Sequence, residues 1–146
     1  MKITRRPAKD SDKAWVKEMH HESYHDVVVA RWGVFDLVKA DGYFNETWAA
    51  GGIDIVLSDD KPCGFVVIEK HPDHFRVQEI ALRRAFWGQG IGTFLLREAL
   101  DEADKKGVPV KLNVMPQNKA LNLYKRLGFV ECGSNDTHTF MERAAS

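Results

Sequence analysis

The alternation of hydrophobic and polar residues predicts a chain of short strands and a few amphipathic helices. Apolar runs of strand length, bounded by glycine, proline and small polar residues, cover residues 2–7, 53–57, 64–68, 75–82, 110–114, 129–133 and 138–141. Helical periodicity covers residues 11–29 and 91–106, and a shorter helix is predicted to begin near Gln117 or Asn118 and to stop at Leu127. Most elements therefore have defined limits before any chemistry is considered.

The stretch from residue 31 to residue 50 has only partial helical periodicity and is rich in aromatic residues. Two tryptophans, two phenylalanines and a tyrosine are interrupted by Gly33 and Gly42. A second core helix and a wall or lid that binds an acceptor molecule both fit this composition. With a helix here the element order is βααβββαβαββ. This order predicts an α/β fold with a mixed sheet of about seven strands, helices on both faces, and a single domain over residues 1–146.

Three glycines at alternate positions, Gly88, Gly90 and Gly92, precede and open the helix at residues 91–106. A glycine-rich loop at the start of a helix is suited to bind anions, because unpaired N–H groups and the positive end of the helix dipole point the same way. Thr93 stands where the dinucleotide-binding fingerprint needs its third glycine, and no P-loop is present. The loop predicts a phosphate or pyrophosphate site of another class, or a turn that merely requires glycine.

The strand at residues 75–82 changes the face on which its apolar residues lie. Phe75 and Val77 occupy odd positions, whereas Ile80 and Leu82 occupy even ones. An inserted residue, a β-bulge near Glu79, would account for the change. Glu79 occupies an odd position, like Phe75 and Val77, and is therefore expected on their apolar face. A carboxylate in an apolar setting takes up a proton more readily, which suits a general base. A solvated glutamate, or a partner for a nearby arginine, is the simpler alternative.

Composition limits the kinds of partner. The 146 residues include 21 Lys and Arg and 21 Asp and Glu, so no net field draws the chain to nucleic acid or to an anionic membrane. Cys63 and Cys132 are too few and too far apart for a disulfide framework or a four-ligand zinc site. No apolar run has the length of a membrane span, and the first residues lack a signal core. We therefore expect a reduced, cytoplasmic protein.

Six histidines raise the question of a metal site. His21 and His25 are one helical turn apart, but the residues between them do not form the H-E-x-x-H order of a zinc-binding helix. His20 and His21 are therefore expected on a solvated helix face, and no metal is predicted.

Two separated motifs resemble the GCN5-related N-acetyltransferases, a family that binds acetyl-CoA. Residues 88–92 (GQGIG) resemble its pyrophosphate loop, and residues 123–129 (LYKRLGF) resemble its fourth-helix signature, L-Y-x-x-x-G-F. Residues 3–8 followed by Asp12 look like its first strand and turn, so the likeness covers essentially the whole chain. The resemblance implies a sheet splayed between the fourth and fifth strands, with acetyl-CoA as cosubstrate in the gap. It also implies direct acetyl transfer to an amine within a ternary complex.

The resemblance carries over to individual residues. Glu79 would act as the base, and Tyr124 would protonate the departing thiolate, while a tyrosine at this position also fits a core role. Ile80, Ala81 and Leu82 are implied to pair with the pantetheine arm through their backbone, and either Gln117 or Asn118 to contact it through its side-chain amide. The residues implied to bind the pyrophosphate are Gly88, Gln89, Gly90, Ile91, Gly92 and Thr93.

Acceptor binding is assigned more loosely. Trp32-Gly33 with Asp36 resembles a W-G-x-x-[DE] element of some small family members, and together with Phe35 it is a candidate acceptor contact. His138, on a late strand, could line the acceptor mouth or simply lie on the surface.

Four positions depart from the family pattern, and one of them is Gln117, which stands seven residues before Tyr124 where the family usually has an asparagine. Trp87 stands where the family often has Arg or Gln, and Arg84 stands where proline is common. Asn113 takes the place at which some members carry a catalytic carboxylate on the strand after the glycine-loop helix. An amide cannot act as a base, so this departure leaves Glu79 as the candidate.

Three functions compete on these grounds. The first is an acetyl-CoA-dependent N-acetyltransferase acting on a small-molecule amine or on a peptide or protein amine. The second is a non-catalytic acyl-CoA-binding module that regulates a partner. The third is acyl transfer with a longer acyl chain or to a hydroxyl acceptor. The sequence does not identify the acceptor, and dimerisation, which is common in such folds, has no supporting residue here.

Overall fold

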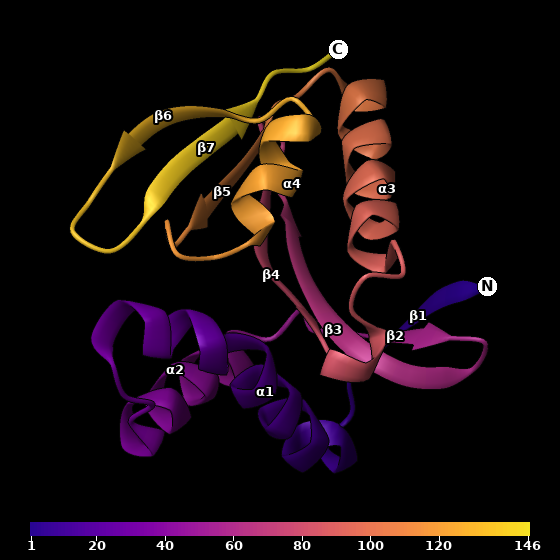
Figure 1. The fold of residues 1–146 in the computed structure, drawn as a ribbon. Coiled ribbons are helices and arrows are strands. Elements are labelled where there is room, and N and C mark those ends of the chain that lie inside the picture. The colour runs from indigo at the N-terminus through magenta and orange to yellow at the C-terminus, as the bar shows by residue number, and fades with distance from the viewer. The chain divides into compact units, whose positions relative to one another are not determined.

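The computed structural model describes residues 1–146, and its helices and strands follow the predicted order (Figure 1). Seven strands form one mixed sheet in the order β1-β2-β3-β4-β5-β7-β6. The predicted α/β class and strand number are thus confirmed. The elements are β1 (Ile3–Pro7), η1 (Asp10–Asp12), α1 (Lys13–Trp32), α2 (Leu37–Ala50), β2 (Asp54–Ser58), β3 (Lys61–Lys70), β4 (Phe75–Leu82), η2 (Arg84–Phe86), α3 (Ile91–Lys106), β5 (Val110–Val114), α4 (Ala120–Arg126), β6 (Val130–Ser134) and β7 (Thr139–Arg143).

The chain divides into two compact units. The N-terminal unit comprises Met1–Val67 and Glu79–Ile91, and the C-terminal unit comprises Ile68–Gln78 and Gly92–Ser146. β3 and β4 each contribute residues to both units. None of the helices combines the length and the apolar composition needed to cross a bilayer.

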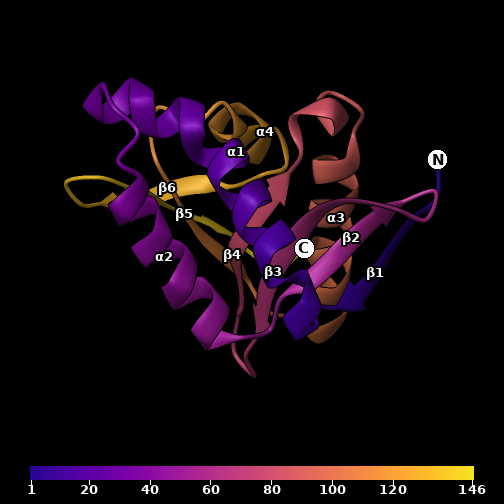
Figure 2. The same cartoon turned by 90° about the horizontal axis from the view of Figure 1, so that it is seen from below.

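The N-terminal unit packs two helices on antiparallel strands. β1 pairs with β2, from Ile3 opposite Ser58 to Pro7 opposite Asp54, and β2 pairs with the first part of β3. α1 and α2 lie side by side (Figure 2). The core of this unit combines residues of both helices with residues of β2, β3 and β4: Val16, Met19, Phe44, Ile53, Ile55, Phe65, Val67 and Ala81.

Residues 31–50 form a second helix, as one of the two open interpretations predicted. α1 extends to Trp32 and ends where the Gly33 N–H donates to the Val29 carbonyl at 2.7 Å. α2 begins at Leu37 because the Asp36 side chain caps it, accepting from the Lys39 N–H at 3.2 Å.

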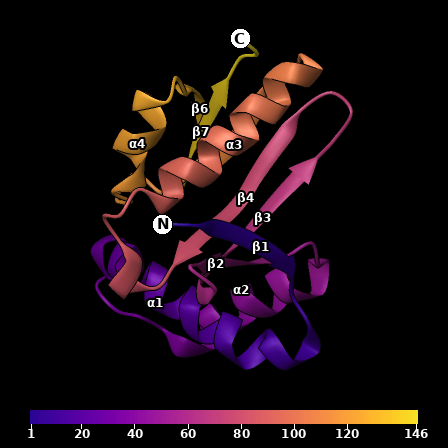
Figure 3. The same ribbon diagram turned by 90° about the vertical axis from the view of Figure 1, so that its right-hand side faces the viewer.

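The C-terminal unit is built around β5. Parallel pairing joins the start of β4 to β5, with Phe75 opposite Val110 and Val77 opposite Leu112. β7 pairs antiparallel with β5 and with β6. The end of β3 and the start of β4 form a hairpin that turns at residues 71–74 (Figure 3). The apolar stripe of α3 is buried as its spacing predicted: Leu95, Leu96, Ala99, Leu100 and Ala103.

The β-bulge expected near Glu79 is not needed to explain burial along β4. Phe75, Val77 and Ala81 are buried, and the Glu79 side chain is only 10% exposed, so burial stays on odd positions throughout. The even positions 80 and 82 are half-buried. A strand inside a sheet with covered faces carries apolar residues at both parities, so a change of parity need not mark an insertion.

α4 ends in a Schellman motif. Gly128 is left-handed, with φ of 96°, and its N–H donates to the Lys125 carbonyl at 3.1 Å. The Phe129 N–H donates to the Tyr124 carbonyl at 3.1 Å, and the two rings meet edge to face at 5.8 Å. These bonds satisfy carbonyls that the helix end would otherwise leave unpaired. The predicted helix stop at residues 127–129 is confirmed.

The left-handed conformation of Gly128 predicts a stability cost for a side chain there. Gly128→Ala should lower the free energy of unfolding by about 1–2 kcal/mol, because a Cβ is strained at positive φ. Gly128→Asn should lose less, since asparagine tolerates this region. Urea unfolding measures both. Gly42→Ala, within α2 and with open space around the new methyl group, is the matched control and should stabilise by up to about 1 kcal/mol.

Candidate active site

Glu79 of β4 points into the N-terminal unit, where it meets His20 of α1. The distance from Glu79 Oε1 to His20 Nε2 is 3.3 Å, and the two side chains are 10% and 7% exposed. A nearly buried carboxylate requires a hydrogen-bonding or charged partner, and the His20 imidazole lies at ion-pair distance from it. Glu79 is therefore not a solvated glutamate at a strand end. Nor does Arg83 hold it, since that guanidinium contacts Glu18 and Glu22.

His20 belongs to a chain of contacts that leads to the surface. Its Nδ1 lies 3.1 Å from His21 Nδ1, and His21 Nε2 lies 2.7 Å from Asp41 Oδ1 on α2. Lys17 Nζ approaches the same carboxylate oxygen at 3.2 Å. The hydrogen bond from His21, with help from Lys17, lowers the pKa of Asp41, so this carboxylate stays ionised.

The expectation of a solvated His20-His21 face is wrong for His20. Its side chain is buried, and its ring packs against Tyr24 at 5.1 Å and Phe44 at 5.8 Å. The sequence held a signal for this position, because His20 follows Val16 by four residues on the stripe that continues to Val27.

The glycine loop has the conformation that an anion site needs. Gly88 and Gly90 are both left-handed, with φ of 74° and 83°, and α3 begins directly afterwards at Ile91. A methyl group added at Gly88, Gly90 or Gly92 would meet no protein atom within 4 Å. The backbone here is therefore open to an approaching phosphate, and the first N–H groups of α3 lie beside it.

The segment that enters the loop is held by α1. The Arg84 backbone N–H donates to Glu22, and the Arg84 guanidinium pairs with Asp26 at 2.9 Å. The same guanidinium lies 4.6 Å from the centre of the Trp87 ring. The two departures from the family pattern, Arg84 and Trp87, thus contact each other and fix the start of the loop.

The three β4 residues assigned to the pantetheine arm differ in their internal contacts. The Leu82 carbonyl accepts from the Trp87 indole N–H at 2.8 Å, so one of its acceptor positions is occupied. The Ala81 carbonyl lies close to Gly64 of β3, where any larger residue would collide with it. Ile80 is half-buried.

In the C-terminal unit, Tyr124 lies on α4. It is half-buried, and burial raises the pKa of its phenol to about 12, so the phenol is neutral at ordinary pH. Of the two candidate amides, Asn118 caps the α4 region, its Oδ1 accepting from the Ala120 N–H at 2.9 Å, whereas Gln117 is exposed. His138 precedes β7, its Nδ1 lies 2.7 Å from Thr137 Oγ1, and burial lowers its pKa.

The residues assigned to the acceptor lie at the α1–α2 connection. Phe35 packs against the rings of His21 and His25, at 5.7 and 5.2 Å. Trp32 is half-exposed, and Asp36 serves as the cap of α2. Phe35 is therefore the one among them that contacts the chain of residues leading from Glu79.

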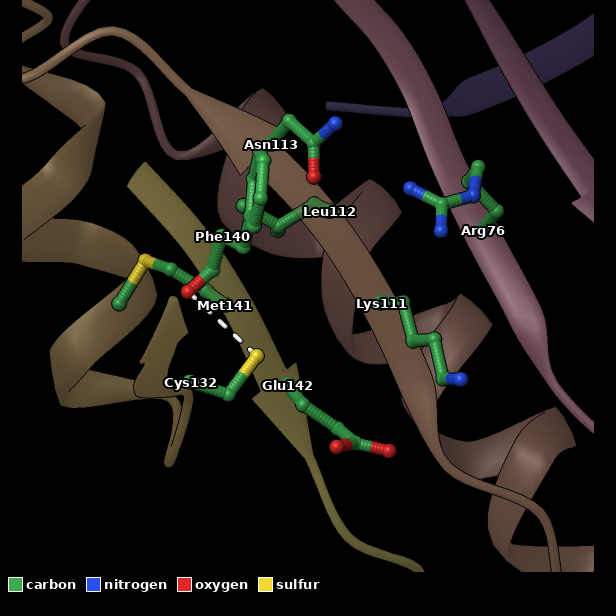
Figure 4. A pocket seen from close by; sticks show the side chains of 8 residues that line it. All are labelled: Arg76, Lys111, Leu112, Asn113, Cys132, Phe140, Met141 and Glu142. Atoms are coloured by element: carbon green, nitrogen blue, oxygen red, sulfur yellow. Dashed lines mark hydrogen bonds between the residues drawn. The ribbon is translucent and has the colours of Figure 1, made fainter. Parts of the chain in front are cut away.

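A pocket of about 360 Å³ lies on the face of the β5–β7 region that α3 and α4 leave uncovered (Figure 4). It contains none of the predicted site residues apart from the noted Asn113, and sequence reasoning did not find it. Its lining combines cations, a carboxylate and apolar side chains: Arg76, Lys111, Leu112, Asn113, Cys132, Phe140, Met141 and Glu142.

Comparison with known proteins decides the family. The sequence model of the acetyltransferase (GNAT) family matches residues 14–129. The chain belongs to this family. An uncharacterized N-acetyltransferase of Methanocaldococcus jannaschii is 37% identical over 112 residues, which is 70% of this chain and 46% of that protein. The chain thus matches about half the length of this relative.

Solved structures share the GNAT fold. The PaiA N-acetyltransferase of Thermoplasma acidophilum, determined with coenzyme A, superposes with a TM-score of 0.76 at 20% identity, over 99% of both chains. The ribosomal-protein-S18-alanine N-acetyltransferase of Escherichia coli superposes with a TM-score of 0.72 at 19% identity, over 99% of this chain and 95% of that one.

Gly92 offers a test of the loop that separates ligand binding from folding. Its φ is not in the left-handed region, and a methyl group there meets no protein atom. Gly92→Ala should therefore keep or raise the melting temperature, because alanine favours helix. Acetyl-CoA affinity should fall at least tenfold, since the methyl group occupies the phosphate approach. Calorimetry and thermal melts measure both, with Gly42→Ala as the control.

For the native chain, acetyl-CoA at 100 times its dissociation constant should add about 2.7 kcal/mol to the free energy of unfolding. The absence of any shift at millimolar ligand would contradict the acetyl-CoA assignment. Unchanged affinity in a folded Gly92→Ala variant would instead show that the loop is only a turn.

Proposed function

We propose that this protein transfers the acetyl group of acetyl-CoA directly to an amine. The observation that carries the proposal is the nearly buried Glu79–His20 pair, which holds a carboxylate at 10% exposure on β4. Such a carboxylate is suited to remove a proton from an ammonium group, which must lose it before the nitrogen can attack.

Acetyl-CoA binding rests on the glycine loop. Its open left-handed backbone and the N-terminus of α3 suit the pyrophosphate. We assign the pantetheine arm to the backbone of Ile80, Ala81 and Leu82, as the family resemblance implies. Between the two amides we favour Gln117 as the side-chain contact, because Asn118 Oδ1 already accepts a hydrogen bond from the Ala120 N–H.

In the proposed reaction Glu79 takes the proton from the acceptor, and the free amine attacks the thioester carbonyl. The C–S bond then breaks, the electron pair leaves with the CoA sulfur as thiolate, and the nitrogen releases a second proton so that a neutral amide forms. Tyr124 has a pKa of about 12, well above the value of about 8.5 for a free thiol, so full proton transfer from phenol to thiolate is uphill. We therefore assign Tyr124 the role of a hydrogen-bond donor to the departing sulfur.

The acceptor is proposed to be an amine on a small molecule or on a peptide. Trp32 and Phe35 would provide apolar contact beside the α1–α2 connection. Asp36 is occupied by its capping bond, which reduces its suitability as a partner for the acceptor cation. His138 remains a predicted contact at the acceptor mouth.

The base role predicts a pH-dependent defect in Glu79→Gln. Release of CoA, detected with a thiol reagent across a panel of amines, should fall about 10²–10⁴-fold near neutral pH. The defect should shrink at high pH, where the amine is already deprotonated. Glu69→Gln is the matched control, because Glu69 also contacts a histidine, His71, but on the surface.

Three outcomes are informative. Full activity in Glu79→Gln would remove the base assignment, and a defect that does not change with pH would indicate a binding or structural role. Tight acetyl-CoA binding without transfer to any amine would favour the alternative of a regulatory acyl-CoA-binding module.

The role of Tyr124 predicts a defect in kcat alone. Tyr124→Phe keeps the ring that packs against Phe129 and removes one oxygen. Steady-state kinetics should show kcat lower by about 10-fold to 100-fold with unchanged acetyl-CoA affinity, because the bond to sulfur forms only as the thiolate departs. Tyr43→Phe, at an exposed position of α2, is the control. Native kcat in a folded Tyr124→Phe variant would reduce Tyr124 to a packing residue.

A further inference from the structure

We propose that His20 and His21, with Asp41, form a side-chain relay that carries protons from Glu79 to solvent. This inference rests on the proposed function, since a base buried against α1 must lose the proton it gains before the next turnover. Glu79 and His20 are both nearly buried, so the proton requires a path out of the N-terminal unit.

The contacts form an unbroken path of increasing exposure. Glu79 and His20 are 3.3 Å apart, His20 and His21 are 3.1 Å apart, and His21 and Asp41 are 2.7 Å apart. The side-chain exposure rises from 10% and 7% for the first pair to 15% for His21 and 34% for Asp41. The His20–His21 and His21–Asp41 contacts are hydrogen bonds, and the Glu79–His20 contact is an ion-pair distance that a proton on Glu79 can bridge.

Counting protons shows that the path holds one mobile proton. Three contacts join four ring nitrogens and two carboxylates, and a hydrogen bond at each contact needs one proton between its atoms. Before Glu79 accepts a proton, both carboxylates are ionised and each ring carries one proton: His20 Nδ1–H lies toward His21, and His21 Nε2–H lies toward Asp41. His20 Nε2, which faces Glu79, then accepts the proton that Glu79 gains. The path therefore takes up one proton at Glu79 while both rings are neutral.

The transfer balances at each step. Glu79 gains an O–H bond as the acceptor loses an N–H bond. The Glu79 O–H then breaks as His20 Nε2–H forms, and His20 Nδ1–H breaks as His21 Nδ1–H forms. Finally His21 Nε2–H breaks, and the proton passes to water beside the ionised Asp41. Glu79 ends as a carboxylate, and rotation of the rings restores the starting tautomers.

The surroundings favour a side-chain path over a water path. Phe44 packs on the His20 ring and Phe35 on the His21 ring, so apolar surface flanks both imidazoles. The titratable and charged groups that face the pair are Lys17 and Tyr24 from α1, Asp41 from α2 and Glu79 from β4.

The test uses glutamine substitutions that keep a hydrogen-bonding amide and remove the titrating ring. His20→Gln and His21→Gln should lower kcat about tenfold at neutral pH and low buffer, with unchanged KM for acetyl-CoA and unchanged melting temperature. A small buffer such as imidazole at high concentration should restore most of the kcat of His21→Ala. His71→Gln, which removes a surface histidine that contacts Glu69, is the matched control.

A second measurement needs no activity. Ring ¹⁵N shifts report the protonation and tautomer of each histidine, so Glu79→Gln should shift the titrations of both His20 and His21 and leave His71 unchanged. Native kcat and buffer dependence in His20→Gln would overturn the relay, as would a His21 titration that ignores Glu79→Gln. Loss of activity in Glu79→Gln with native kinetics in both histidine variants would reject the relay and keep the proposed function.

Discussion

The contact between Glu79 and His20 is the interaction on which the N-terminal unit depends. Removing a carboxylate from water costs several kcal/mol unless a partner compensates, and a hydrocarbon side chain at position 20 would leave that cost unmet. The imidazole can compensate only if α1 turns this residue inward. Val16 and Met19 secure that orientation by filling the core on the same face of the helix. The inward orientation of this face of α1 is therefore required both for core packing and for the contact between His20 and Glu79.

Residues of α1 also hold the segment that leads into the glycine loop. Glu22 and Asp26 hold Arg84 through its backbone and its guanidinium, and Arg84 stacks on Trp87 immediately before the loop. Each exposed ion pair contributes little alone, but a backbone bond, a bidentate pair and a ring contact on one short segment restrict it together. One helix thus positions both the candidate base and the segment that enters the candidate phosphate loop, which includes Arg84 and Trp87.

Periodicity and turn residues predicted most of the fold because they are local properties. The limits of α3 and β5 followed from an apolar stripe, a glycine and a proline, and no tertiary contact was needed to place them. Glu79 was placed inward correctly from its parity, but the burial pattern of β4 does not require the accompanying β-bulge, because parity alone does not reveal that both faces of a strand are covered. His20 was missed since the adjacent histidines were considered as a metal motif, when position 20 lies on the apolar stripe of its own helix.

The spacing of the L-Y-x-x-x-G-F signature has a structural cause that is independent of catalysis. Tyr124 supplies the carbonyl that the Phe129 N–H needs, Gly128 supplies the left-handed residue between them, and the two rings close the motif. A helix that ends this way requires an interval of four residues from the tyrosine to the glycine, whatever the phenol does. The motif is therefore stronger evidence for the fold than for a catalytic acid at Tyr124. What the sequence could not supply is the pairing between residues far apart in the chain, and it is this pairing, between α1 and β4, that carries the proposed chemistry.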